Sequence, residues 1–495
     1  MNIAFITCEL APWVKVGGLA DVSSSLARAL NTLGHEVQII VPYTGVMERP
    51  ETVQDPPRRC GHLADPAWSW QEVPLSEGLS VLWISGPGFS GRSGTSYADA
   101  SGRLWPDLVE RYAQFCKALV STYAQPGLDT PTRPDILHGH DWPMGLLPFW
   151  AQQLGTGVPT VLTIHNLGYP GLMDRGTFDR LGLPPGLWND DSGILLGQSA
   201  SSLKAGLRFA DQLTTVSPSY AREIATPEYG RGLVRLVRER NPDLSGILNG
   251  IDSDTWNPGT DPALPAHYTV QSISGKLQCR KRLLERLSLG DTPHPVAGFV
   301  GRLVREKGID LLEAVIPELV ARHWRLVLLG KGTPDMEHRL SEYCRPYQGK
   351  VALVTEQSES WAHLIMAGAD LFLMPSRYEP CGLTQMYSQR YGTPPIAHAV
   401  GGLVDTVRDA DSGPGGTGFL FDEPSAQALL SCCLRAERAF HDPGRWSTIR
   451  ESAMILDFSW QSRAREYERI YRRAIDLRRK CTSCSAQSRA PKSSS

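Results

Sequence analysis

Short runs of consecutive apolar residues alternate along most of the chain with longer segments in which apolar residues recur every three or four positions. The first run spans residues 3–6, and a glycine-containing loop separates it from a helical pattern over residues 22–33. Gly34 supplies a helix stop, and residues 37–41 form the next apolar run. The chain therefore opens as a β-α-β unit, which is typical of parallel α/β layers.

A second series of the same kind begins near residue 296. The pattern predicts one helix over residues 309–320. It predicts strands over residues 296–300, 326–329, 351–354, 371–374 and 395–399. Between the two series, Asn249-Gly250-Ile251-Asp252 and the proline-rich stretch 257–265 indicate a domain joint.

These patterns predict an N-terminal Rossmann-like domain over residues 1–250 and a C-terminal Rossmann-like domain over residues 251–456. An arginine-rich helix over residues 457–480 is expected to cross back to the N-terminal domain. The serine-rich residues 481–495 are expected to be disordered.

The composition is that of an ordinary globular protein. The chain of 495 residues is long enough for two large domains, and 41% of its residues are hydrophobic and 21% charged. Its 50 basic and 52 acidic residues give a net charge of −2, which suggests neither a nucleic-acid nor a membrane partner. The first residues lack a signal sequence, and there is no run of about 18 apolar residues, so we expect a cytoplasmic protein.

The number of cysteines also indicates a cytoplasmic protein. Ten cysteines are too few for a disulfide scaffold, and reduced thiols fit a cytoplasmic protein better. Cys481 and Cys484 form a single CxxC in the polar tail, but no further zinc ligands lie nearby in the sequence.

A pair of glycines occurs at a corresponding place in each half of the chain. Val16-Gly17-Gly18-Leu19-Ala20-Asp21-Val22 recurs as Val400-Gly401-Gly402-Leu403-Val404-Asp405-Thr406-Val407, each time between a strand and a predicted helix. Paired glycines there leave backbone N–H groups accessible to an anion at a helix N-terminus, although one such pair alone is more often only a tight turn. Its presence in both halves favours two glycine loops that bind a ligand.

Candidate charged groups follow two of the predicted strands of the second half. Arg302 and Lys307 lie five residues apart on a strand-to-helix turn, where two cations can hold a diphosphate and neutralise the charge that develops as it leaves. Their spacing equally allows two solvated loop cations. Glu379 follows the strand predicted over 371–374, so it could stabilise a positively charged sugar-like transition state or complement the dipole of the helix that begins near Gly382.

Histidines follow two predicted strands of the first half. His138-Gly139-His140-Asp141-Trp142 comes after the strand 135–137, and His165-Asn166 comes after the strand 161–164. The cluster of His138, His140 and Asp141 leaves a metal-dependent hydrolase open as an alternative, although no further ligand cluster supports it. We therefore expect no metal and no cofactor.

Taken together, these motifs resemble the bacterial glycogen synthases and plant starch synthases. The resemblance runs in order from residue 1 to about 475, and the ordered set is highly specific although each motif alone is weak. In the first half it rests on Lys15 to Val22, His140-Asp141-Trp142, Thr163-Ile164-His165-Asn166-Leu167, Lys204-Ala205-Gly206-Leu207, Ala210-Asp211 with Thr215-Val216-Ser217-Pro218, and Leu248-Asn249-Gly250-Ile251-Asp252. In the second half it rests on Gly301-Arg302 with Lys307-Gly308, Glu379 to Gln385, Gly401-Gly402-Leu403, and Asp457-Phe458-Ser459-Trp460.

This resemblance implies a GT-B fold, with two Rossmann-like domains facing each other across a deep cleft. It also implies a retaining, metal-independent transfer of glucose from ADP-glucose to the non-reducing end of an α-1,4-glucan such as glycogen. By resemblance, Glu379 lies beside the glucosyl ring, His140 lies on the opposite face of the anomeric carbon, and Arg302 and Lys307 bind the diphosphate. The remaining donor-binding residues implied are Lys15, Gly17, Gly18, Asp21, Asn249, Gly382, Leu383 and Thr384.

Some positions depart from the family pattern. Val16 and Val400 stand where many bacterial members have a threonine, and the segment from Gly275 to Arg280 has Cys279 and Arg280 substituted. Whether Lys276 is a site residue is therefore open. Another two-domain nucleotide-sugar glycosyltransferase and a non-catalytic glucan-binding protein are further alternatives, and sequence physics alone does not decide between ADP-glucose and UDP-glucose.

Overall fold

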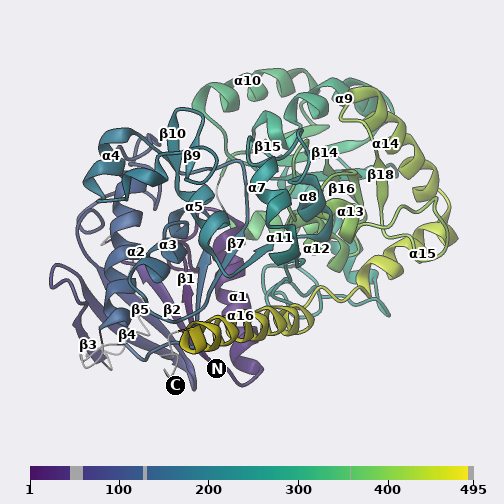
Figure 1. Ribbon diagram of the computed structural model, residues 1–495. Coiled ribbons are helices and arrows are strands. Elements are labelled where there is room, and N and C mark those ends of the chain that lie inside the picture. Colours follow the sequence, from purple (N-terminus) through teal and green to yellow (C-terminus); the bar gives the residue numbers. More distant parts are fainter. Residues whose placement is uncertain (45–58, 126–130, 357, 489–495) are drawn as a thin grey trace, which may run out of the picture. The chain divides into compact units, whose positions relative to one another are not determined.

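The computed structural model describes residues 1–44, 59–125, 131–356 and 358–488 (Figure 1). The chain forms two compact units. Unit 1 contains Met1–Gly250 and the C-terminal segment from Trp460 onward, and unit 2 contains Ile251–Ser459. None of the described helices combines the length and the apolar character that a membrane crossing requires.

Unit 1 is built on a nine-stranded, mostly parallel sheet with the order β12-β11-β7-β6-β1-β2-β5-β4-β3. Among the described strands of this sheet, only the pairings of β3 with β4 and of β4 with β5 are antiparallel. Its strands are β1 (Asn2–Ile6), β2 (Glu36–Pro42), β3 (Arg59–His62), β4 (Ser69–Ser76), β5 (Leu79–Ser85), β6 (Ile136–His140), β7 (Thr160–Ile164), β11 (Gln212–Thr215) and β12 (Leu244–Gly246). A small separate sheet joins β8 (Leu172–Met173), β10 (Ser199–Ser201) and β9 (Leu195–Leu196).

Some helices of unit 1 pack on this sheet and others on the small sheet or on neighbouring helices. They are α1 (Gly18–Thr32), α2 (Leu108–Ala124), α3 (Leu147–Gln153), α4 (Arg175–Arg180), α5 (Ser202–Phe209), α6 (Pro218–Glu223), α7 (Val234–Glu239) and α16 (Trp460–Ser488). Helix α1 ends as its sequence predicts, because Gly34 follows it with a φ of 84°, which glycine adopts without strain.

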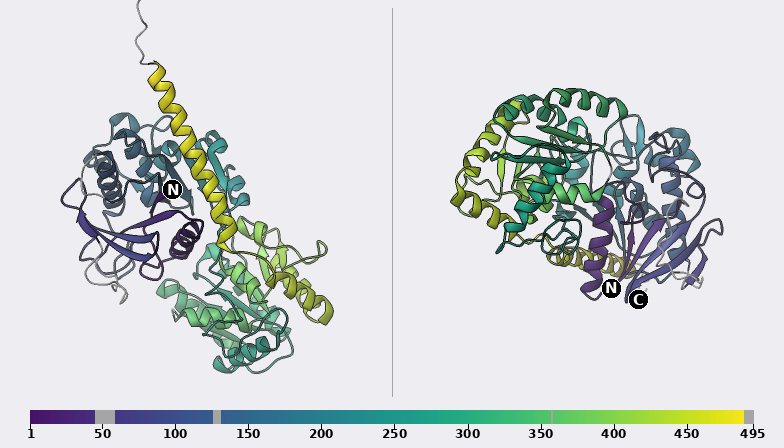
Figure 2. Two further views of the ribbon diagram at one scale, coloured as in Figure 1. Left: turned by 90° about the horizontal axis from the view of Figure 1, so that it is seen from below. Right: turned by 180° about the vertical axis from the view of Figure 1, so that it is seen from behind.

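Helix α16 is one long helix of unit 1 (Figure 2). Trp460, Ala464, Tyr467, Tyr471 and Ala474 recur every three or four residues and are buried in the same core cluster as the apolar residues of α1 and β1. The prediction that the tail is disordered from residue 481 was wrong for residues 481–488, which continue the helix. The segment contains neither glycine nor proline, so an existing helix can propagate through it. Residues 489–495 and the side chains of Cys481 and Cys484 lie outside the described part of the protein.

Unit 2 is built on a six-stranded parallel sheet with the order β15-β14-β13-β16-β17-β18. Its strands are β13 (Val296–Val300), β14 (Arg325–Leu329), β15 (Val351–Val354), β16 (Leu371–Met374), β17 (Pro395–His398) and β18 (Phe419–Phe421). Its helices are α8 (Ser274–Arg286), α9 (Ile309–Ala321), α10 (Pro334–Cys344), α11 (Glu359–Gly368), α12 (Thr384–Arg390), α13 (Gly402–Thr406), α14 (Ala426–Phe440) and α15 (Pro443–Met454).

Each sheet has a point where the chain changes its direction of travel across the strands. In unit 2 the chain runs from β13 outward to β15, then returns to β16 on the other side of β13 and continues to β18. In unit 1 it runs from β1 outward through β2, then returns to β6 on the other side of β1. Ligands of open α/β sheets bind beyond the carboxyl ends of the strands at such a switch point. The loops after β13 and β16 in unit 2, and after β1 and β6 in unit 1, are therefore the places where a ligand is expected.

Candidate active site

The two switch-point loops of unit 2 carry the charged residues that the sequence singled out. Arg302 and Lys307 lie in the loop after β13, and Lys307 ends a short 3-10 helix (Arg305–Lys307). Glu379 lies in the loop after β16. Gly308 keeps these loops in contact, because its φ is 74° and an added Cβ would lie 2.1 Å from the carbonyl oxygen of Pro375. A side chain at position 308 would therefore force the two loops apart.

Lys307 and Glu379 form an ion pair across these two loops. The Nζ atom of Lys307 lies 2.5 Å from Oε2 of Glu379, and the hydroxyl of Ser376 donates a hydrogen bond of 3.0 Å to the same oxygen. The side chain of Glu379 is buried and that of Lys307 is only partly exposed. Arg302, by contrast, is exposed to solvent. The loops thus present a cation–carboxylate pair and a second, more exposed cation five residues earlier in the chain.

The second glycine pair supports the Glu379 loop from behind. The N–H of Gly402 donates to the carbonyl oxygens of Glu379 and Pro380 at 3.1 and 3.2 Å, and a Cβ at position 402 would lie 2.3 Å from the carbonyl oxygen of Cys381. The expectation that this glycine pair exposes its N–H groups to an anion was therefore wrong for Gly402. The close approach of two loops, rather than ligand binding, explains the glycine there.

Gly382, Leu383 and Thr384 lead into α12. Gly382 has a φ of 74°, and the side-chain amide of Gln385 donates to the carbonyl oxygens of Cys381 and Gly382 at 2.9 and 3.0 Å. Helix α12 begins at Thr384 without a side-chain N-cap. Its first backbone N–H groups are therefore not satisfied by a capping side chain.

The first glycine loop lies after β1 and is folded around a buried carboxylate. Oε2 of Glu9 accepts the N–H groups of Val16 and Gly17 at 3.0 and 2.8 Å, and Oε1 accepts the hydroxyl of Tyr97 at 2.8 Å. Burial raises the pKa of Glu9. The sequence reasoning missed Glu9, and its amide partners are not left open to an external anion as expected. The exposed side chain of Lys15 pairs with Asp21 at 2.9 Å, so this loop still presents a cation.

Strand β6 extends three residues further than predicted and carries both His138 and His140. The expectation that these histidines follow the strand was wrong. In a strand, residues two apart share a face, and Gly139 points the other way, where an added Cβ would lie 2.9 Å from Met144. Both imidazoles are fully buried, with ring centroids 4.2 Å apart and ring planes tilted by 42°, and the ring of His140 also lies 4.2 Å from that of Phe5.

His140 contacts His165, the histidine at the end of β7. Nδ1 of His140 lies 2.9 Å from Nε2 of His165, so one proton is shared between two imidazoles. Burial holds the pKa of His165 at about 3 and that of His140 well below its usual value, so both rings are neutral at pH 7. His165 is only half-buried, whereas His140 is enclosed. The structure thus places His165, not His140, where a ligand can reach an imidazole.

Asp141 holds the two histidine strands together at this edge. Its Oδ1 accepts the N–H groups of His165 and Asn166 at 2.6 and 3.1 Å. The Asp141 backbone has a φ of 58° and a ψ of −172°, a conformation that is otherwise confined to glycine and costs about 1–3 kcal/mol. Strain of this kind persists only where surrounding contacts enforce it, and it is typical of functional sites.

Two further residues flagged in the sequence are buried. Asn249 is 6% exposed at the end of unit 1, and its Oδ1 has no hydrogen-bond partner within the described residues. Lys276 is 4% exposed, and its ammonium donates to the carbonyl oxygens of Ala367 and Tyr391 and to the hydroxyl of Thr393 at 3.0, 3.1 and 2.6 Å. Lys276 is thus a structural residue of unit 2, which answers the question that its substituted motif left open.

The histidine cluster does not have the geometry of a metal site. His138 uses both ring nitrogens, which lie 2.9 Å from the hydroxyl of Tyr471 and 2.7 Å from that of Thr163. Asp141 is committed to backbone amides. Among the described residues there is no group of three or more His, Cys, Asp or Glu side chains that could hold a metal ion. The metal-dependent hydrolase therefore receives no support from the donor set.

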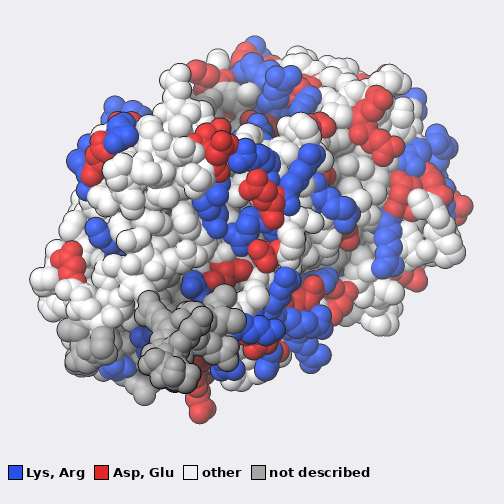
Figure 3. Space-filling model, viewed as in Figure 1, with Lys and Arg blue, Asp and Glu red and all other residues white. Residues whose placement is uncertain are grey.

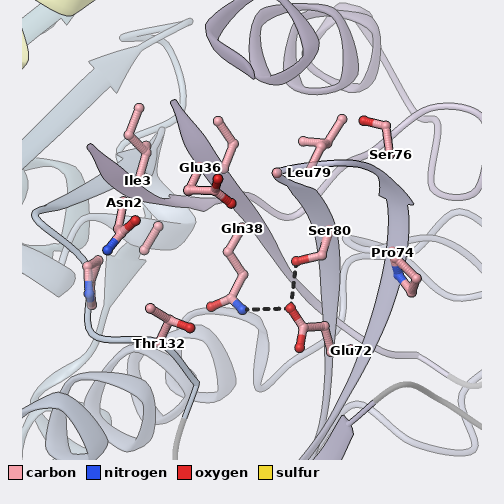
Figure 4. Close-up of a pocket in the computed structure, with 14 residues that line it drawn as sticks. Asn2, Ile3, Glu36, Gln38, Glu72, Pro74, Ser76, Leu79, Ser80 and Thr132 are labelled. Carbon is pink, nitrogen blue, oxygen red and sulfur yellow. Dashed lines mark hydrogen bonds between the residues drawn. The ribbon is translucent and has the colours of Figure 1, made fainter. Parts of the chain in front are cut away.

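A cavity of about 180 Å³ opens at the other edge of the unit 1 sheet (Figure 4). It is lined by residues at the amino ends of β1, β2 and β5, including Asn2, Glu36 and Leu79. On its wall, Glu72 accepts hydrogen bonds from Ser80 and Gln38 at 2.9 and 3.4 Å. Because the switch-point loops follow the carboxyl ends of the strands, this cavity is no part of the candidate site.

Comparisons with known proteins agree with this arrangement. Residues 2–239 match the family described as the starch synthase catalytic domain, and residues 286–437 match the glycosyl transferases group 1. The glycogen synthase of Cellvibrio japonicus is 42% identical over 479 residues, which cover 95% of this chain and 98% of that protein. The glycogen synthase of Anaeromyxobacter dehalogenans is 43% identical over 481 residues, which cover 95% and 99% of the two chains.

Solved structures give the same result. The catalytic domain of starch synthase IV from Arabidopsis thaliana superposes with a TM-score of 0.84 at 31% identity, covering 96% of this chain and 99% of that one. Sucrose-phosphate synthase from Thermosynechococcus elongatus superposes with a TM-score of 0.61 at 22% identity, covering 96% and 99%, and at that identity shows the fold alone. The chain belongs to the family of bacterial glycogen synthases and plant starch synthases, which are retaining glycosyltransferases with the GT-B fold of two Rossmann-like domains.

Proposed function

We propose that the chain transfers glucose from ADP-glucose to the non-reducing end of an α-1,4-glucan such as glycogen. The observation that carries the proposal is the ion pair of Lys307 and Glu379 at the switch point of unit 2. Breaking a sugar–phosphate bond leaves positive charge on the ring and adds negative charge to the departing diphosphate. A lysine beside a buried glutamate offers one group of the required sign for each charge.

The roles of the individual residues follow from their chemistry. Lys307 and the exposed Arg302 bind the diphosphate and stabilise it as it leaves. Glu379, held by Lys307 and Ser376, faces the glucosyl ring. Gly382, Leu383 and Thr384 contribute the uncapped start of α12 to the donor phosphates.

In unit 1 we assign Lys15 and the loop with Gly17, Gly18 and Asp21 to the donor as well, together with Asn249. His165 replaces His140 as the imidazole that contacts the sugar, because it is the more accessible of the two. His140 keeps a supporting role through the 2.9 Å contact between their rings. A neutral imidazole can donate one hydrogen bond to a sugar hydroxyl and accept another.

An adenine nucleotide is favoured by one solved relative. The starch synthase IV structure, at 31% identity over nearly the whole chain, contains ADP and acarbose. This supports ADP-glucose as the donor and a glucan as the acceptor for the present chain.

We further propose that the transfer needs no metal ion. Arg302, Lys307 and Lys15 supply positive charge that a divalent cation provides in other phosphate-binding sites. A cytoplasmic location is also proposed, since the eight described cysteines are free thiols, which a reducing compartment preserves.

A donor comparison tests the function. Purified protein is given glycogen with labelled ADP-glucose or UDP-glucose, each with and without excess EDTA, and label in the polymer is counted. We expect incorporation from ADP-glucose that persists in EDTA. Incorporation only from UDP-glucose would overturn the donor assignment, and a loss that magnesium or zinc restores would overturn metal independence.

A further inference from the structure

Arg377 lies two residues before Glu379 and reaches into the loop that carries Lys307. Its two terminal nitrogens donate to the two carboxylate oxygens of Asp310 at 2.7 and 2.9 Å. One of them also donates to the carbonyl oxygen of Arg305 at 3.1 Å, and the backbone N–H of Arg377 donates to the carbonyl oxygen of Glu306 at 2.8 Å. Four hydrogen bonds from one residue thus join the loop after β16 to the loop after β13 and to the first turn of α9.

These four contacts are made by residues that are close in sequence to the two members of the ion pair. Arg305, Glu306 and Asp310 lie on both sides of Lys307 in the sequence, and Arg377 lies beside Glu379. The relative position of Lys307 and Glu379 therefore depends on how firmly Arg377 holds the 305–310 segment. A bidentate arginine–carboxylate pair fixes an orientation as well as a distance, which a lysine cannot do.

We propose that Arg377 and Asp310 are positioning residues, which set the distance between Lys307 and Glu379 for the transfer reaction without contacting the substrate. The proposal rests on the function proposed above for Lys307 and Glu379. Both terminal nitrogens of Arg377 are already engaged with the protein, so its guanidinium acts on the reaction through the neighbouring loop.

Unit 2 provides a matched control that separates positioning from a purely structural role of this pair. Asp310 lies in the first turn of α9, where a carboxylate stabilises the helix dipole. Arg435 makes a comparable bidentate pair with Asp409 and is 29% exposed, against 25% for Arg377. Arg435 lies on α14 and none of its described contacts involves the loops of the site. If Arg377 only stabilised the fold, Arg377→Ala and Arg435→Ala should behave alike.

The test compares Arg377→Ala, Arg377→Lys, Asp310→Asn, the double variant Arg377→Ala/Asp310→Asn and the control Arg435→Ala. For each, kcat, the KM for glycogen, the Kd for ADP by calorimetry and Tm are measured. We expect Arg377→Ala to lower kcat about 100-fold, since a misplacement of about 1 Å costs about that much, and to leave the KM for glycogen unchanged. The double variant should be no slower than Arg377→Ala, because the two side chains act as one unit.

Arg377→Lys keeps the positive charge but cannot form the bidentate pair with Asp310. We therefore expect an intermediate loss of about tenfold in kcat with nearly unchanged Tm. This variant also decides the case if Arg377→Ala fails to fold. Arg435→Ala should keep kcat within about twofold of the wild type, even where its Tm falls. The proposal is overturned if Arg377→Lys keeps wild-type kcat, or if Arg435→Ala loses as much kcat as Arg377→Ala.

ADP binding separates this proposal from the proposed function. If the wild type transfers glucose from no donor, the proposed function fails, but its affinity for ADP still reports on the Lys307 loop. In that case Arg377→Ala should weaken ADP binding about tenfold while Arg435→Ala leaves it unchanged. An unchanged Kd for ADP in Arg377→Ala would then overturn the positioning role as well.

Discussion

The Nζ atom of Lys307 lies 2.5 Å from Oε2 of Glu379, although the two residues are 72 positions apart in the chain and follow different strands. The pairing gives each group a second function. The lysine places a positive charge beside a buried carboxylate, and the carboxylate holds the ammonium group at the carboxyl edge of the sheet. A substitution of either residue should therefore also change the position of the other side chain.

We expect Lys307→Ala to lower kcat by about 10²–10³, because a preorganised contact to the leaving diphosphate is lost. Glu379 would then remain buried with only Ser376 as a described side-chain partner. Steady-state kinetics of the variant and the wild type measure the loss.

Lys331→Ala is the control for Lys307→Ala, since Lys331 forms a more exposed pair with Glu337 at 3.7 Å in the same unit. Its kcat should match that of the wild type. Glu379→Gln should lose nearly as much kcat as Glu379→Ala, because the amide keeps the shape and loses the charge. Near-wild-type kcat in a folded Glu379→Gln protein would contradict the charge-stabilising role.

Lys15→Ala should raise the KM for ADP-glucose by about tenfold and leave the fold intact. The side chain of Lys15 is 40% exposed and paired with Asp21, and such exposed pairs contribute about 0–1 kcal/mol to stability. Donor kinetics and Tm are measured on the same preparation, with Lys281→Ala as the control for loss of an exposed lysine pair. A large drop in Tm with unchanged KM would make Lys15 a structural residue.

Much of the fold was predictable because its signals are local. The strand Val296–Val300 and the start of α9 at Ile309 match their predicted positions, since an apolar run and a helical periodicity are both read within a few residues. The sequence also singled out the paired glycines as special positions, but it did not reveal which contact requires each glycine. Gly402 is required by the carbonyl oxygen of Cys381, and only the folded chain brings these two atoms together.

The strand order and the buried polar contacts could not be predicted from the sequence. The periodicity of apolar residues does not show that β1 lies beside β6 or that β13 lies beside β16. These strand pairs nevertheless form the switch points beside which the site residues lie. For the same reason the sequence did not reveal that Glu9 holds the loop at Val16 and Gly17, or that β6 continues to His140. Charge distribution adds little, since basic and acidic side chains are interspersed over the face in Figure 3.

His165→Ala and His140→Ala should separate function from stability. Since we propose that His165 contacts the sugar, we expect His165→Ala to lower kcat about 100-fold. The change in Tm should be modest, because His165 is only half-buried. His140 is fully buried between Phe5 and His138, so its loss leaves a cavity and should cost about 3 kcal/mol of unfolding free energy. Urea unfolding and steady-state kinetics on both variants test this. A large loss of kcat in a fully stable His140→Ala protein would instead favour direct contact of His140 with the sugar.

Lys276 should affect the pH dependence of stability and not the reaction. Burial lowers its pKa from an ordinary value near 10.5 to about 7. Below pH 7 the ammonium is protonated in both the folded and the unfolded chain, so folding carries the full cost of burying the charge. Between pH 7 and 10.5 the folded amine is neutral while the unfolded one still binds a proton, so the unfolding free energy rises with pH.

Lys276→Met removes this titration while keeping the length of the side chain. We therefore expect the stability of the wild type relative to Lys276→Met to increase by about 2 kcal/mol between pH 7 and pH 9, because up to one proton is released on folding over that range. Urea unfolding of both proteins at the two pH values measures the difference, and effects of other titrating groups cancel in it. The KM for ADP-glucose should be the same in both proteins, since Nζ of Lys276 donates only to groups of unit 2 such as Ala367 and Thr393. A stability difference that does not change with pH would show that Lys276 remains charged in the folded protein. A higher KM for ADP-glucose in Lys276→Met would show that Lys276 contributes to donor binding.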